Sequence, residues 1–169
     1  MLSKVKEEEA KRRMKELLTS FDGRSLTGAL CGYIFEKYAI EVLEKGGEFA
    51  CRRLNKGEEH EEPDLRICAS KKIQVKKPES GQTAHQLYVP ESMNYPGIDA
   101  WIPGIGAFQM TVAKQHSINS SVEDDLAKLG RGAENLYWVL HTEQNYYAFT
   151  EQKPARKINQ YAVLIKLLS

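Results

Sequence analysis

Apolar and polar positions follow two different periods along this chain, and the period separates predicted helices from predicted strands. Residues 26–45, LTGALCGYIFEKYAIEVLEK, are apolar at helical spacing and are followed by two glycines. This pattern predicts a long helix that is covered on most sides. Glu36 falls within its apolar stripe, so its carboxylate needs a partner, a metal ion or a cavity.

Shorter stretches have strand character. We expect a strand at 48–54 (EFACRRL), a polar loop at 55–63, and two short strands in 64–77 that separate near Ser70. GIDAWI and AFQMTVA, at 97–102 and 107–113, predict a hairpin joined across PGIG. A helix is expected over about 122–129, with Ser121 as its cap. The stretches 136–142, 146–151 and 161–168 are interpreted as strands, although the last also suits a short helix.

The predicted elements indicate one domain with a charged leading segment. Residues 4–18 have few apolar positions, and Asp22-Gly23 is a turn signal. We therefore divide the chain into a charged N-terminal helix or linker, 1–22, and a single domain, 23–169, as its length of 169 residues favours. The predicted order of elements is a helix, several strands, a helix and a strand. This order predicts an α+β or α/β fold, with a mixed central sheet flanked by helices.

Composition excludes several classes of protein. No apolar run approaches the roughly 20 residues that cross a bilayer, and the first segment is too charged for a signal peptide, so we expect neither. Cys31, Cys51 and Cys68 are dispersed without a CxxC pair, which disfavours zinc and a disulfide framework. A net charge of +1 means that any binding to nucleic acid must use a local patch.

The predicted hairpin carries a candidate metal site. Gln109 and Thr111 share one strand face, and Asp99 comes into range of Gln109 across the turn. An acid and an amide oxygen suit Mg²⁺ or Mn²⁺, which can supply a nucleophilic water to a phosphodiester. The alternative is structural: Asp99 caps backbone donors at the turn and Gln109 pairs with a neighbour.

Two blocks of this sequence resemble a known family. The C-terminal domains of crinkler effectors of oomycetes and fungi are similar to two blocks of this chain, LYVPESMNYPGIDAW and FQMTVAKQH. The similarity extends to the preceding stretch GYIFEKYAIEVLEKGGEFACRRL. The two blocks are also similar to a segment of trypanosome retrotransposon hot spot proteins. The resemblance spans most of residues 26–142, and its most specific part is Asp99, Gln109, Thr111 and His116.

The resemblance implies a restriction-endonuclease-like fold of the PD-(D/E)XK class and metal-dependent hydrolysis of nucleic acid. Asp99 would then bind the metal, Gln109 would stand where an acid is usual, and Glu36 would be the acid of the first core helix. Thr111 replaces the usual lysine, and Lys114 or Lys76 is a candidate substitute. His116 either orients a phosphate or transfers a proton, or is only a loop residue.

A rival set has a more literal match to the same signature. Pro63-Asp64 is followed by Gln74 and Lys76 on one predicted strand face, which keeps the lysine. We rank it second, because Asp64 closes an acidic loop whereas Asp99 lies among apolar strands. Short signatures of this kind also arise by chance.

Three functions remain open at this point. The first is an effector nuclease, secreted by the pathogen and acting in host cells, commonly in the nucleus. The second is an inactive version that binds DNA or a host protein, and the third is a plain interaction domain. Two basic pairs, Arg52-Arg53 and Lys76-Lys77, are candidate phosphate contacts or simply solvated surface. DNA is the expected nucleic acid, RNA stays open, and oligomeric state is not predicted.

Overall fold

The computed structural model describes residues 4, 5, 8, 9, 12, 13, 16, 26–154 and 157–166. Its elements are helices α2 (Leu26–Lys45), α3 (Val122–Ala127) and α4 (Glu143–Ala148), and eight strands. The strands are β1 (Gly47–Arg53), β2 (His60–Ile67), β3 (Ile73–Val75), β4 (Tyr88–Pro90), β5 (Ala100–Ile102), β6 (Gly106–Met110), β7 (Asn135–Leu140) and β8 (Asn159–Leu164). The fold is therefore mixed α and β, as the sequence predicts.

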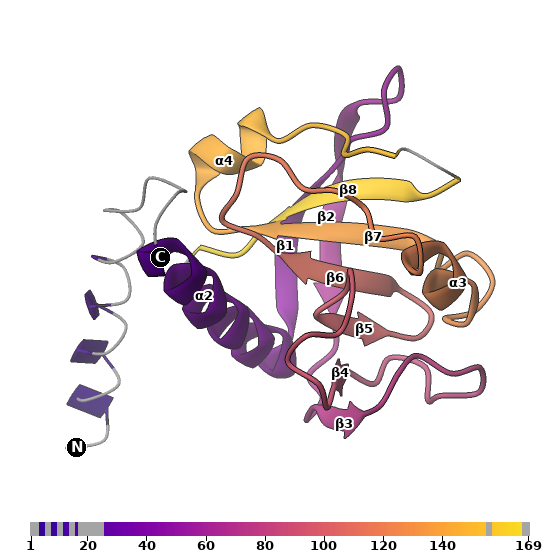
Figure 1. Ribbon diagram of the computed structural model, residues 1–169, viewed down its shortest axis with the longest axis horizontal. Coiled ribbons are helices and arrows are strands. Elements are labelled where there is room, and N and C mark those ends of the chain that lie inside the picture. The colour runs from indigo at the N-terminus through magenta and orange to yellow at the C-terminus, as the bar shows by residue number, and fades with distance from the viewer. Residues whose placement is uncertain are drawn as a thin grey trace.

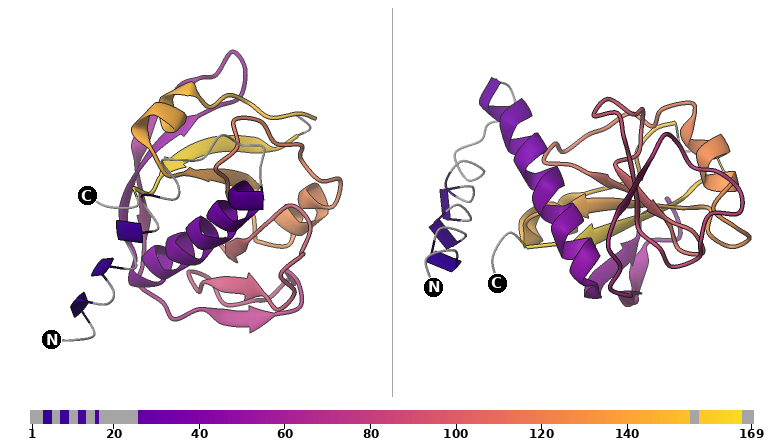
Figure 2. Two further views of the ribbon diagram at one scale, coloured as in Figure 1. Left: turned by 60° about the vertical axis from the view of Figure 1, so that its left-hand side comes forward. Right: turned by 90° about the horizontal axis from the view of Figure 1, so that it is seen from below.

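All eight strands form one sheet in the order β2-β1-β8-β7-β6-β5-β4-β3. Strands β6, β7 and β8 are parallel neighbours, β5 and β6 form an antiparallel hairpin, and β3 is parallel to β4. The sheet curls around α2, which lies on its concave side, while α3 lies outside (Figures 1 and 2). Because of this curl, residues 68–72 suffice to connect the two edge strands, β2 and β3.

Each face of the sheet has its own apolar cluster. On the concave face, Phe35, Ala39 and Leu43 of α2 pack with Phe108 and Met110 of β6. On the other face, Trp101 and Trp138 pack with α3 and α4 through Val122, Leu126 and Tyr146. The prediction that one face of β6 is apolar is confirmed. The other face is also largely covered, since Ala107 and Thr111 are both buried.

The helix over 26–45 and the hairpin across residues 103–105 are confirmed. Two sequence-based predictions are wrong. The polar loop of 55–63 ends early, because β2 begins at His60 and pairs with β1 along an exposed sheet edge. The stretch 146–151 is not a strand: α4 covers Glu143–Ala148, and the Thr142 hydroxyl caps it by accepting the Asn145 N–H. Aromatic strand propensity thus gave way to a strong N-cap.

The charged N-terminal segment is described only at scattered positions. Those between residues 4 and 16 are helical, and Arg12 and Arg13 both pair with Glu9. The turn at Asp22-Gly23 and the domain boundary beside it lie outside the described residues. Within the described part of the chain, no helix has the length and apolar character to cross a membrane.

Candidate functional site

Asp99 lies where the regular ladder between β5 and β6 ends. Its N–H donates to the Phe108 carbonyl over 2.8 Å, and its own carboxylate accepts the Met110 N–H over 2.8 Å. Burial, and then the negative charge of Glu36, raise the pKa of Asp99 to about 7, against the weaker opposing effects of the Met110 N–H and Lys37. Asp99 is therefore a half-buried acid within electrostatic range of a second acid, Glu36 of α2.

Glu36 is half-buried on α2, one turn after the point where Gly32 approaches Val112. Burial raises the pKa of Glu36, and the neighbouring Lys37 partly offsets that effect. The structure therefore brings together Glu36 and Asp99, two acids that come from distant parts of the sequence. Two desolvated carboxylates in mutual range repel each other, so a proton or a cation between them relieves that cost.

Gln109 is held on the other side of the sheet. Its Nε2 lies 3.4 Å from His116 Nδ1, and the His116 ring packs 5.6 Å from Trp138 in the outer cluster. Burial lowers the pKa of His116 and so favours the neutral imidazole. A neutral ring can accept a hydrogen bond from the Gln109 amide N–H. The backbone N–H of His116 donates to the side-chain Oε1 of buried Gln152. Gln109 and His116 therefore form a polar pair of their own, away from the two acids.

Thr111 and Lys114 occupy the end of β6 and the loop after it. Thr111 is buried, its N–H donates to Val139 over 3.1 Å, and its hydroxyl accepts the Ala113 N–H over 3.0 Å. This is a turn that terminates the strand. Lys114 is exposed in the loop that follows. Thr111 thus has a local structural role at the end of β6.

Arg52 and Arg53 are both engaged within the protein. The Arg52 guanidinium donates to Tyr146 O at 2.9 Å, Tyr147 O at 3.2 Å and Phe149 O, and it lies over the Tyr146 ring. It therefore closes the C-terminal end of α4. The Arg53 guanidinium donates to Tyr161, Glu58 and Asn159. Both guanidinium groups therefore make several hydrogen bonds within the protein.

The rival set is separated by the sheet. Asp64 lies on β2 and Gln74 on β3, and these are the two edge strands at opposite ends of the strand order. The set of Asp64, Gln74 and Lys76 therefore draws on two strands that are not paired with each other, and it stays second to the set built on Asp99. Lys76 and Lys77 themselves are exposed, directly after β3.

His141 is a feature of this end of the sheet that the sequence did not single out. It follows β7, and its ring packs 5.4 Å from Phe35, the neighbour of Glu36 on α2. Its Nδ1 is buried and has no hydrogen-bond partner among the described residues, and burial lowers its pKa. The only signal in the sequence was a histidine that directly follows an apolar strand.

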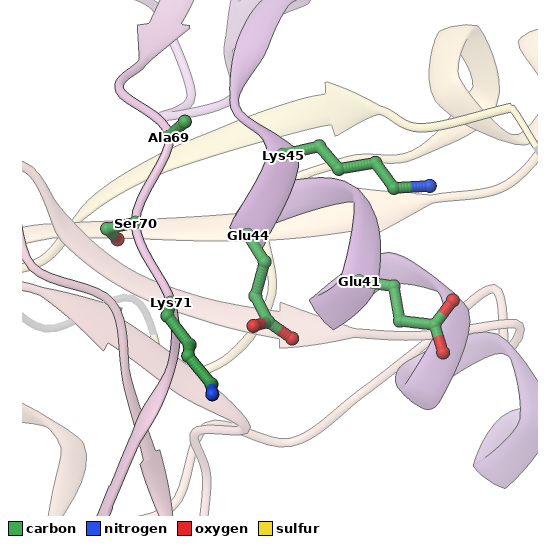
Figure 3. A pocket seen from close by; sticks show the side chains of 6 residues that line it. All are labelled: Glu41, Glu44, Lys45, Ala69, Ser70 and Lys71. Carbon is green, nitrogen blue, oxygen red and sulfur yellow. The ribbon is translucent and has the colours of Figure 1, made fainter.

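A separate hollow of about 480 Å³ lies at the C-terminal end of α2. Figure 3 shows the Glu44 side chain extending from α2 toward the end of the Lys71 side chain, whereas Glu41 and Lys45 point away from it. The Glu44 backbone carbonyl accepts the Ser70 N–H, and its carboxylate accepts the Lys72 N–H. These bonds attach the 68–72 connection to α2, so the hollow is explained by the fold.

The residues present suit a divalent cation only in part. Mg²⁺ is commonly held by one or two carboxylates with waters completing its shell, which Glu36 and Asp99 can supply. Across the described residues, no group of three or more His, Cys, Asp or Glu is placed to hold a metal. The amide of Gln109 is directed to His116. The fit is therefore to a cation held by two carboxylates.

Comparison with known proteins gives two relatives. Crinkler effector protein 15 of Phytophthora infestans is 42% identical over 158 residues, which cover 90% of this chain and 25% of that protein. Crinkler effector protein 16 of the same organism is 39% identical over 170 positions, covering 98% and 27%. The chain is homologous to crinkler effectors. It spans about a quarter of the length of each crinkler relative. No protein-family model and no solved structure matches the chain.

Proposed function

We propose that this chain is an effector domain that hydrolyses phosphodiester bonds of nucleic acid inside host cells, with a divalent cation held by Glu36 and Asp99. The effector role follows from homology to two crinkler effector proteins. DNA in the host nucleus is the proposed substrate. The observation that carries the chemical part is the pairing of Glu36 and Asp99 at the junction of α2 with the β5–β6 hairpin.

The order of elements supports a restriction-endonuclease-like core. Helix α2 carries Glu36, and after β1 to β4 the chain reaches Asp99 and the β5–β6 hairpin. Helix α3 and then β7, which is parallel to β6, follow the hairpin. The additional strands β1, β2 and β8 extend the sheet on one side, and β3 and β4 extend it on the other.

The residues of this chain would have the following roles. Glu36 and Asp99 would hold the cation, which when bound would activate a water and offset negative charge on the phosphate. The Met110 N–H fixes one Asp99 oxygen, so the other oxygen keeps its lone pairs for the cation. Burial of Asp99 makes its charge costly without a counter-ion and therefore favours cation binding.

A cleavage assay tests this proposal. Plasmid DNA, single-stranded DNA and single-stranded RNA are incubated with the protein and Mg²⁺ or Mn²⁺. The proposal predicts cleavage that needs the metal and is lost in Glu36→Gln and Asp99→Asn, with Asp64→Asn as the control that stays active. Cleavage that survives Asp99→Asn in a folded protein, or no cleavage with either metal, would overturn it.

A second candidate is an inactive module of the same fold that binds nucleic acid or a host protein. The observation that favours it is at β6, where buried Thr111 occupies the lysine position and Gln109 contacts His116. Electrostatic stabilisation of a transition state by that lysine is thereby missing from the strand. The assay separates the candidates, because an inactive module binds labelled DNA with a steep salt dependence or captures a protein, but cleaves nothing.

A further inference from the structure

Lys76 directly follows edge strand β3, and Asp99 directly precedes β5, two strands away in the sheet. Val75, the last residue of β3, is paired with Pro90 of β4. Tyr88 of β4 is paired with Trp101 of β5, and continuing this antiparallel register places Pro90 opposite Asp99. Two strand spacings of about 4.8 Å each therefore separate the backbone of Val75 from that of Asp99. Lys76 comes directly after Val75, at the same end of the sheet.

The two lysines after β3 belong to opposite faces. Val75, the last residue of β3, packs against the outer cluster, and continuing the alternation past the end of the strand assigns Lys76 to the concave face. Glu36 of α2 acts on Asp99 from this same face. Lys77 is directed the other way, and its positive charge acts on Asp125 of α3. Lys76 is therefore the one of the pair that shares a face with the two acids.

Charge is distributed unevenly between the two edges of the sheet. The β2 edge carries Glu61, Glu62 and Asp64, with Glu58 and Glu59 just before it. The β3 edge is flanked by lysines on both sides, namely Lys71, Lys72, Lys76 and Lys77. A polyanion is repelled from the first edge and attracted to the second. Asp99 lies in the half of the sheet that ends at β3.

We infer that Lys76, at the end of edge strand β3, holds a backbone phosphate of the nucleic acid next to the one at Glu36 and Asp99. The nucleic-acid strand then lies along the β3 edge of the sheet and extends away from the acidic β2 edge. The backbones of Val75 and Asp99 are about 10 Å apart, a span that the long Lys76 side chain can shorten enough to reach the phosphate adjacent to the one at the two acids. This inference rests on the proposed function of the site in binding nucleic acid.

The test is a binding measurement in a background that does not cleave. The Asp99→Asn protein is used in EDTA, so that both the metal and one repulsive negative charge are absent. Fluorescence anisotropy then measures its binding to a labelled DNA duplex or single strand over a series of salt concentrations. Adding Lys76→Gln is expected to weaken binding about fivefold at 0.1 M salt and to lower the salt slope by about one. Lys76→Arg keeps the charge and is expected to retain the affinity.

Lys77→Gln is the matched control, since it removes the same charge from the adjacent exposed residue on the other face. Its expected effect is less than about twofold. Equal losses for the two variants, no loss for Lys76→Gln, or no binding at all would overturn the inference. Failure of cleavage alone would overturn the proposed hydrolysis but would leave a Lys76-specific loss of binding standing.

Discussion

Glu36 on α2 and Asp99 before β5 form an electrostatically coupled acid pair, in which the charge of Glu36 contributes to raising the pKa of Asp99 to about 7. Burial of Asp99 is the larger cause. Residues 95–99, which include Pro96 and Gly97, form the segment that leads into Asp99. This segment delivers an acid to the end of the β5–β6 ladder, where its carboxylate takes the Met110 N–H and faces α2.

Stability without metal is expected to depend on pH through Asp99. Its pKa is about 7 in the folded state and 3.8 for the ordinary side chain, so the folded state holds the proton more tightly. The contribution of Asp99 to the free energy of unfolding therefore falls as pH rises from about 4 to 7. Asp99→Asn, which stays neutral, should gain stability relative to wild type over this range. Urea unfolding at pH 5 and pH 8 measures the difference, and an equal difference at both values would contradict the assignment.

The approach to Asp99 depends on Gly97, which has a φ of +80°. A Cβ there would lie 2.4 Å from Val122 Cγ2 and 2.9 Å from Asn119 Cβ. Gly97→Ala is therefore expected to reduce the free energy of unfolding by about 2–4 kcal/mol, which combines backbone strain and overpacking.

Gly104 is the matched control for that substitution. It has a φ of +87°, but no atom lies within 4 Å of an added Cβ. Gly104→Ala should cost about 1–2 kcal/mol, which is the backbone term alone. Chemical denaturation of both variants gives the comparison. Equal losses would show that the contact of Gly97 with α3 does not constrain the loop that carries Asp99.

Arg52 is expected to act on stability and not on nucleic acid. Its guanidinium donates to three carbonyls at the end of α4, so Arg52→Gln should lower the free energy of unfolding by about 2 kcal/mol. Arg66→Gln removes an exposed ion pair with Glu48 and should cost less than about 1 kcal/mol. A loss of DNA affinity in a fully folded Arg52→Gln protein would contradict this assignment.

The sequence predicted those parts of the fold and site that depend on local pattern. Apolar spacing located α2 and placed Glu36 on a side that requires a partner, and turn residues located the β5–β6 hairpin. It did not reveal that Gln109 contacts His116, because that contact depends on how the loop over 111–117 folds back. Nor did it separate Asp64 from Gln74, since strand order in a sheet is set by long-range pairing.

The most direct test of the account is a titration of Mn²⁺ into the protein, followed by electron paramagnetic resonance of the free ion. Wild type is compared with Glu36→Gln, Asp99→Asn and Gln109→Ala. We predict one site, an affinity at least about tenfold lower in each of the two acid variants, and little change in Gln109→Ala, whose amide contacts His116. Unchanged affinity in Glu36→Gln and Asp99→Asn, or loss only in Gln109→Ala, would contradict a cation site built from Glu36 and Asp99.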